Sequence, residues 1–289
     1  MLKRIWKLAW NTIVAFNDDS ALSRGASIAF FTITALAPVL LIVIAIAGLT
    51  FGEEAARNAL ADQLSGLMGR QSAEMLQAAI ASAAARSTGV LASIIGVLTL
   101  IFTASGVFGE MQRSLNDIWK AEPKGTTVSR LIRARAVSLG LVVALGFVLT
   151  VSLVISAALT ALGGYINAYI PFGQQILALV NAAISILLIA VLFAAIYKVL
   201  PDKQLAWRDV AVGALATSVL FNVGKTLIGW YIGSSAVASS YGAAGALIVI
   251  LLWIYYSSLI FLFGAEFTKV YAATYGSRTD DASLTVTRA

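Results

Sequence analysis

The sequence predicts an all-α protein, a polytopic bundle of six transmembrane helices. Hydrophobic residues make up 60% of the 289 residues, whereas charged residues make up only 12%. Six apolar segments are each long enough, as helices, to cross a hydrocarbon core of about 30 Å. Lys and Arg gather in alternate connections between these segments, which is typical of a membrane protein with a fixed orientation.

Residues 1–24 are predicted to form a cytoplasmic helix that lies along the membrane surface. Apolar side chains recur at helical spacing from Leu2 to Phe16, and Lys and Arg occupy the other faces. Trp6 and Trp10 belong to the residue type that anchors such helices at the interface. The Asp-Asp-Ser sequence at residues 18–20 interrupts this pattern and can cap the next helix.

The six predicted spans occupy residues 25–270. The first runs from about Ala26 to Phe51 and contains Pro38, whose missing N–H predicts a kink and makes it a candidate hinge. The others cover about Thr88–Gly109, Ala136–Leu162, Ile176–Leu200, Val210–Ile232 and Tyr241–Glu266. Small residues four apart, such as Gly229 with Gly233, predict close helix contacts.

Between the first two spans, residues 52–87 are predicted to form two short amphipathic helices outside the cytoplasm. Leu60 and Leu64 share one stripe, and Gly69 is of the residue type that commonly ends a helix. Ser72 can cap the second helix. We interpret this pair as a lid or interfacial cover over the bundle rather than as a catalytic domain.

The distribution of basic residues predicts the orientation. Sixteen Lys and Arg lie in the N-terminal segment, in the second-to-third and fourth-to-fifth connections, and in the tail. The first-to-second connection has three, and Lys225 lies within the fifth span. By the positive-inside rule both termini are cytoplasmic, with residues 271–289 as a disordered tail. The same bias accounts for the net charge of +6 without a nucleic-acid partner.

The residue types that are missing restrict the chemistry. Cysteine and histidine are both absent, which removes thiolates, the commonest general base and the commonest metal ligand. No glycine-rich phosphate loop or nucleophile–base set occurs. The sequence therefore predicts no cofactor, no metal site and no enzyme activity, although a membrane transferase that uses lone carboxylates stays open.

Two charges within the predicted spans, Lys225 and Glu266, are candidate functional residues. Lys225 is sixteen residues from Asp209, which is about 24 Å along a helix. Glu266 lies at the opposite, cytoplasmic end of the last span. The two charges are therefore predicted to lie near opposite surfaces. Either can face an internal cavity; the alternatives are a lysine that snorkels outward and an interfacial carboxylate.

Two further groups of polar residues are candidates. Glu110 and Asn116 close the second span, where they can form a polar gate or simply a solvated helix end. The middle of the last span carries four consecutive polar side chains: Tyr255, Tyr256, Ser257 and Ser258. Four such residues sweep about 300° of a helix, so some must face the bundle interior, either to contact a substrate or to hydrogen-bond other helices.

Several short motifs follow one another along the chain. They are Gly25–Phe31 with Pro38, Phe108–Trp119, Pro201 with Trp207, Gly224–Lys225 with Tyr231, Tyr241–Ala246, and Leu252–Ser257 with Gly264–Glu266. Through their order and spacing the sequence resembles the YihY/BrkB family along nearly its whole length. The resemblance implies a six-helix protein of the bacterial inner membrane. Some members are associated with virulence through serum resistance, and others with export or tolerance of lipopolysaccharide precursors.

The family has also carried a ribonuclease BN label, which the absence of histidine and the small soluble mass oppose. The resemblance supplies no catalytic residues. The leading hypothesis is a transporter or flippase-like protein for an amphipathic or lipidic envelope molecule. The alternatives are a non-transporting scaffold for envelope assembly and an ion- or proton-coupled antiporter that uses Glu266 or Glu110. Membrane lipids are the expected partners, and a homo-oligomer stays open.

Overall fold

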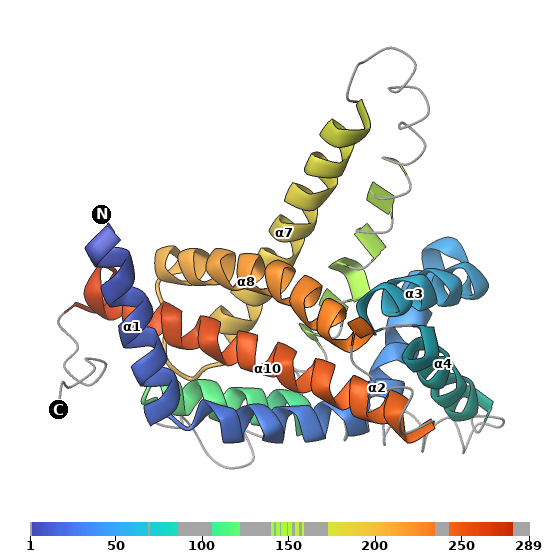
Figure 1. Ribbon diagram of the computed structural model, residues 1–289, viewed down its shortest axis with the longest axis horizontal. Helices are drawn as coiled ribbons and strands as arrows, with labels where there is room; N and C mark the ends of the chain where they lie inside the picture. Colours follow the sequence, from blue (N-terminus) through green and yellow to red (C-terminus); the bar gives the residue numbers. More distant parts are fainter. Residues whose placement is uncertain are drawn as a thin grey trace.

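The computed structural model describes residues 2–68, 70–85, 106–121, 173–234 and 243–279, and scattered positions between 140 and 158. All regular secondary structure in these residues is helical, as predicted. The labelled helices are α1 (Leu2–Asp18), α2 (Ala21–Phe51), α3 (Glu53–Met68), α4 (Arg70–Ala85), α7 (Gly173–Val199), α8 (Trp207–Ser234) and α10 (Ala243–Thr274). Figure 1 shows α10 crossing the molecule, with α1 near one end and α3 and α4 near the other.

Three helices are long and apolar enough to cross a membrane: Gln175–Val199, Trp207–Tyr231 and Leu247–Thr274. A fourth candidate is α2, whose parts Ala21–Leu36 and Val39–Leu49 are bent by 54° relative to each other. Pro38 lies at this bend, where its ring cannot donate a backbone hydrogen bond. The predicted second and third spans, about Thr88–Gly109 and Ala136–Leu162, lie largely outside the described residues.

The last helix, α10, extends beyond the predicted span. It continues to Thr274, past the predicted boundary at residue 270, so Glu266 lies two turns inside the helix. Ser277 follows in a turn and donates to Asp209 Oδ2 from its backbone nitrogen at 3.2 Å and from its hydroxyl at 2.6 Å. The first residues of the predicted tail are therefore attached to the start of α8. The rest of the tail lies outside the described residues.

The first helix, α1, contacts α10 through a narrow face and leaves its apolar stripe exposed. Thr12 and Ala15 are buried, and the Phe16 ring lies 5.8 Å from that of Phe263 in α10. Trp6 and Trp10, by contrast, are 72% and 56% exposed. This exposed stripe suits the predicted position of α1 along the membrane interface, because indole rings favour that layer.

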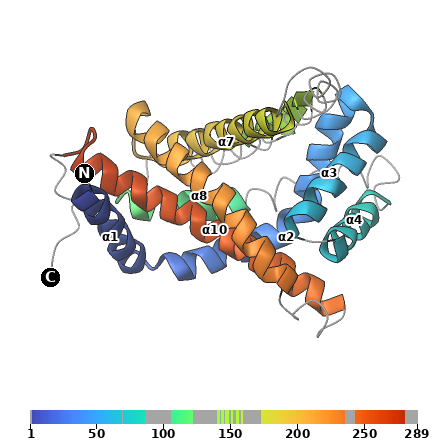
Figure 2. The same ribbon diagram turned by 45° about the horizontal axis from the view of Figure 1, so that its top comes forward.

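The α3–α4 pair lies where the sequence predicts two amphipathic helices, although α4 begins at Arg70, before the expected cap at Ser72. Gly52 makes the turn from α2 into α3 with a positive φ of 86°, which a side chain would strain. Leu64 and Ile80, from the apolar sides of the two helices, share a core with the second half of α2 and the start of α10. Figure 2 shows the pair set to one side of α10.

Two glycines set the closest approach of α8 and α10. A Cβ atom at Gly213 would lie 1.8 Å from Thr268 Oγ1, and one at Gly264 would lie 1.9 Å from Thr217 Oγ1. Each helix therefore receives the other's threonine over its own glycine, a typical device for close packing in membranes. The predicted close contact at Gly229 is wrong for the described residues, because a Cβ there would meet nothing within 4 Å.

We predict that Gly213→Ala destabilises the protein, whereas Gly229→Ala in the same helix does not. The new methyl group at residue 213 would overlap Thr268, and such overpacking costs about 1–3 kcal/mol. At residue 229 no atom of the described residues would lie within 4 Å of the new methyl group, so alanine should improve helix propensity without a clash. Thermal unfolding in detergent compares the two variants with the wild type. Equal melting temperatures for both variants would contradict the close contact.

Candidate functional site

A charged cluster joins three elements at the α1 end of the molecule. The ammonium of Lys269 lies 2.7 Å from Asp19 Oδ2 and 2.6 Å from Glu266 Oε2. The ammonium of Lys120 lies 2.5 Å from the other oxygen of Asp19. We call these four residues the Asp19 cluster. They come from the α1–α2 turn, from α10 and from the turn that follows helical residues 106–118.

Burial makes the central pair of this cluster unusual. The side chain of Glu266 is fully buried and that of Lys269 is 6% exposed, whereas Lys120 reaches solvent. Neither oxygen of Glu266 accepts a hydrogen bond of regular geometry from the described residues, although Lys269 lies at ion-pair distance. A buried carboxylate without a counter-charge is very costly, so Lys269 is the group that makes an ionised Glu266 tolerable.

The local sequence explains how the cluster forms. Glu266 and Lys269 are three residues apart on α10, which places them on one face. Asp19 follows the last residue of α1, where Ser20 adopts a left-handed φ of 54° and makes no side-chain cap. The predicted capping role of Ser20 is therefore wrong. Arg24 holds the turn by donating from Nε to the Asp19 carbonyl at 2.8 Å and by pairing with Asp117.

The pKa of Asp19 reflects these neighbours. Burial raises the pKa of this carboxyl group, but hydrogen bonds from Lys120 and Lys269 outweigh burial and hold the pKa below its ordinary value. The carboxyl groups of Asp19 and Glu266 are neighbours, because both contact the ammonium of Lys269. The cluster is thus a carboxyl pair arranged around one shared ammonium.

Asn116 forms a second link at the same end. Its Nδ2 donates to Asp202 Oδ2 at 2.8 Å, and its Oδ1 accepts from the backbone nitrogen of Asp202 at 2.8 Å. Lys203 donates to the Trp119 carbonyl at 3.2 Å. These bonds attach the loop after α7 to residues 106–121. Asn116 therefore joins two segments of the chain, and its amide is already occupied.

Glu110 lies apart from this network. Its carboxylate pairs at 2.5 Å with Arg113 on the same helix, and the arginine side chain is 66% exposed. Within the described residues it makes no ion pair with the Asp19 cluster. In the described structure Glu110 and Glu266 thus have different partners, Arg113 and Lys269.

Lys225 and Glu266 do not meet. A Cβ at Gly224 would lie 3.1 Å from the Tyr256 hydroxyl, so Lys225 lies level with Tyr256 on the neighbouring helix. Tyr256 is ten residues before Glu266, which is about 15 Å along the axis of α10. Lys225 is half-buried, and it forms no ion pair within the described part of the chain. The two charges are therefore too far apart to form an ion pair in this structure.

The polar band in the middle of α10 is used for packing. Ser257 and Ser258 donate to carbonyls of their own helix, those of Trp253 and Ile254, at 2.8 Å each. The Tyr255 hydroxyl lies 3.4 Å from the Leu22 carbonyl in α2. Because Tyr255, Ser257 and Ser258 already donate to backbone carbonyls, these three side chains need no ligand to complete their hydrogen bonds.

Sequence reasoning found Glu266 but missed its partners. Asp19 was interpreted as part of a cap, and Lys269 as one of the basic residues that orient the tail. The available signal was the spacing of Glu266 and Lys269, which is that of a helical ion pair. No local pattern could indicate Lys120, which is 101 residues from Asp19 in the sequence.

The comparison with known families agrees with the helical membrane architecture. Residues 12–286 match the family model described as Virulence factor BrkB. The chain belongs to the BrkB family. Because the match leaves out only short ends, it includes every member of the Asp19 cluster.

Relatives of this BrkB family member are membrane proteins by name. The UPF0761 membrane protein MS0032 of Mannheimia succiniciproducens is 26% identical over 276 residues, covering 93% of this chain and 91% of that protein. A UPF0761 membrane protein of Alkalilimnicola ehrlichii is 25% identical over 89% of this chain but 56% of its own length.

The putative ribonuclease-like protein YfkH of Bacillus subtilis is 26% identical, and the match covers 63% of this chain and 65% of YfkH. For several other relatives, this chain spans little more than half of the relative's length. No solved structure is similar to it.

We predict that Lys269→Met destabilises the protein by about 3–5 kcal/mol, because it leaves the buried carboxyl group of Glu266 without its counter-charge. Arg57→Met is the matched control: Arg57 pairs with Glu53 on an exposed helix surface, where such pairs contribute about 0–1 kcal/mol. Thermal unfolding measures both. In the double variant Glu266→Gln/Lys269→Met, part of the lost stability should return. Equal losses for Lys269→Met and Arg57→Met would contradict the assigned importance of the cluster.

A second prediction concerns acid. Because the folded-state pKa of Asp19 is depressed, its ionised form stabilises the fold above the unfolded pKa of about 3.9, and this contribution disappears as the pH falls through the folded-state value. The stability difference between wild type and Asp19→Asn should therefore be present at neutral pH and shrink below about pH 4. Melting temperatures measured as a function of pH test this. A difference that is constant from neutral to acidic pH would show that the Asp19 charge is not the stabilising feature.

Proposed function

We propose that this protein moves an amphipathic or lipidic envelope molecule across the bacterial inner membrane, as a transporter or flippase. The observation that carries the proposal is the Asp19 cluster, which ties the start of α2 and the end of α10 together around the fully buried Glu266. Charged contacts between separate spans at one end of a bundle are suited to holding an alternating-access transporter closed on that side.

The shape of α2 supports this proposal. Transporters commonly use discontinuous helices, and α2 is bent by 54° where Pro38 lies. Arg24, on the first part of α2, pairs with Asp117. The second part leads through Gly52 into α3 and α4. A pivot at Pro38 would move the α3–α4 pair while the first part of α2 stays attached at the Asp19 end.

The exposed apolar surfaces of the candidate spans support a lipidic substrate. Large apolar side chains are exposed along the candidate spans, including Leu179 and Leu187 on α7 and Leu227 on α8. Such surfaces are in contact with acyl chains in a bilayer. A substrate that already resides in the membrane can reach the spans laterally, without an aqueous pore.

Proton coupling is a second candidate, favoured by the carboxyl pair. Asp19 and Glu266 share Lys269, so a proton bound by Glu266 would leave that lysine paired with Asp19 alone. The ion pair that is lost lies within α10, whereas the contact between Lys269 and Asp19 joins α10 to the α1–α2 turn, so a proton on Glu266 changes the charge balance at the contact between the two elements. The charged groups that contact Asp19 are Lys120 and Lys269, and the charged group that contacts Glu266 is Lys269. In the scaffold alternative the same cluster is a permanent clamp.

The test is transbilayer movement of fluorescent phosphatidylglycerol in proteoliposomes. Wild-type protein should accelerate movement above protein-free vesicles, and Glu266→Gln should change the rate by about tenfold, which corresponds to about 1.4 kcal/mol in the barrier. Glu54→Gln, the same substitution at an exposed position, should leave the rate unchanged. No acceleration by the wild type would support the scaffold. Acceleration that is insensitive to an imposed pH gradient would exclude proton coupling.

A further inference from the structure

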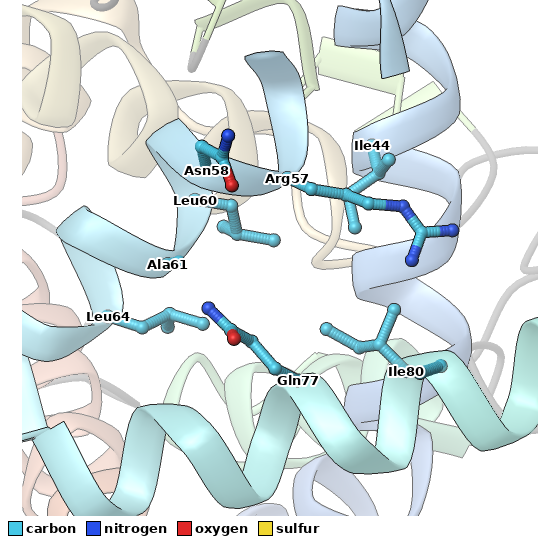
Figure 3. A pocket seen from close by; sticks show the side chains of 9 residues that line it. Ile44, Arg57, Asn58, Leu60, Ala61, Leu64, Gln77 and Ile80 are labelled. Carbon is cyan, nitrogen blue, oxygen red and sulfur yellow. The ribbon is translucent and has the colours of Figure 1, made fainter. Parts of the chain in front are cut away.

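The α3–α4 pair and α2 enclose a cavity of about 230 Å³ at the end of the molecule away from the Asp19 cluster. Figure 3 shows the side chains around it. They are Ile44, Arg57, Asn58, Leu60, Ala61, Leu64, Gln77, Ile80 and Ala81. The cavity thus lies beneath the helices that the sequence predicts to form a cover.

The wall of the cavity changes from apolar to polar. Ile44, Leu64 and Ile80 are buried and belong to the core shared by α2, α3 and α4. Asn58 and Gln77 are exposed, so they mark the opening. In Figure 3 the Gln77 amide extends from α4 toward Leu64, and Asn58 lies above it on α3. A molecule that fills this space therefore needs an apolar part inside and a polar part at the mouth.

Arg57 is the charged side chain that lines the cavity, and its charge is paired with that of Glu53. Arg57 donates from Nε at 3.1 Å and from Nη2 at 2.5 Å to one oxygen of Glu53. A guanidinium has five N–H donors, so its Nη1 group stays available in the described structure. No carboxylate lines the cavity, and neither amide at the mouth is occupied by a hydrogen bond within the described residues. These donors suit an anionic headgroup and its ester or hydroxyl oxygens.

The size limits the apolar part. Sites for drug-sized molecules have volumes of roughly 300–1,000 Å³, and this cavity is smaller. It can accept a segment of one acyl chain but not two chains side by side. The surrounding bilayer is the natural source of such chains.

We propose that this cavity binds one acyl chain of an anionic lipid, with the headgroup at Arg57, Asn58 and Gln77. The site does not depend on transport, because a scaffold can also hold a structural lipid. If the protein does not accelerate lipid movement, the proposed binding site can still be correct. If the cavity does not bind lipid, the proposed transport function can still be correct. The occupant can be a single-chain lipid or one chain of a phospholipid, which share this chemistry.

Native mass spectrometry of the full chain, released from detergent, tests the site. The probes are lysophosphatidylglycerol, phosphatidylglycerol, zwitterionic lysophosphatidylcholine and inorganic phosphate. Lysophosphatidylglycerol should bind with one-to-one stoichiometry and more tightly than lysophosphatidylcholine. Binding of phosphatidylglycerol at the same site would identify a bilayer phospholipid as the source, and binding of the lyso-lipid alone would identify a single-chain lipid.

Matched variants locate the binding. Arg57→Gln removes the cation at the mouth and should weaken anionic lipid binding about tenfold, or 1.4 kcal/mol. Arg113→Gln removes an arginine that is likewise paired within its helix and should have no effect. Ala61→Phe fills the cavity and should also weaken binding, whereas Ala55→Phe, at an exposed position of the same helix, should not.

Some outcomes would overturn the proposal. One is that all four variants bind lysophosphatidylglycerol equally tightly. The others are that lysophosphatidylcholine or inorganic phosphate binds the wild type as tightly as lysophosphatidylglycerol does. Thermal unfolding of each variant shows that it is folded. If Ala61→Phe does not fold, the comparison of Arg57→Gln with Arg113→Gln decides alone, because both arginines are partly exposed at the surface.

Discussion

The ammonium of Lys269, shared between two carboxyl groups, is the interaction on which the arrangement at one end of the molecule depends. Its distances to Asp19 and Glu266 are 2.7 and 2.6 Å. Glu266 is fully buried, so the pair is effectively shielded from water and neither charge can be left alone without a large desolvation cost. The ion pair between Lys269 and Asp19 holds the α1–α2 turn against α10, and Lys120 extends this contact to residues 106–121.

The remaining helices are held by a different kind of contact. Between α8 and α10 the reciprocal Gly213–Thr268 and Thr217–Gly264 contacts bring the two backbones close together. The Tyr197 hydroxyl on α7 adds a bond of 2.7 Å to the Phe261 carbonyl. Such contacts depend on shape and are insensitive to charge. The α7–α8–α10 unit can therefore stay intact when the Asp19 cluster loosens, while α2, with its bend, can change its angle.

Much of this fold could be predicted from the sequence, because hydropathy and length alone identify long apolar helices. What the sequence could not supply were contacts between distant segments. Local rules assigned residues 18–20 to a cap, yet Asp19 binds lysines from elsewhere in the chain. Small-residue spacing drew attention to Gly229, yet the close approach is at Gly213, because spacing alone does not tell which helix face meets a neighbour. Glu266 marked the end of an apolar run, but α10 continues to Thr274.

The contacts that a polar side chain already makes also decide where a ligand can bind. A polar side chain can serve a ligand only if its hydrogen bonds are not already used. In the middle of α10, Ser257 and Ser258 are satisfied within their own helix, so a polar residue at membrane depth does not by itself mark a binding site. At the mouth of the α2–α3–α4 cavity, the amides of Asn58 and Gln77 stay available beside an apolar floor. The polar groups that we propose for lipid binding therefore lie under the α3–α4 pair, and the charges that can hold the opposite end closed lie around Lys269.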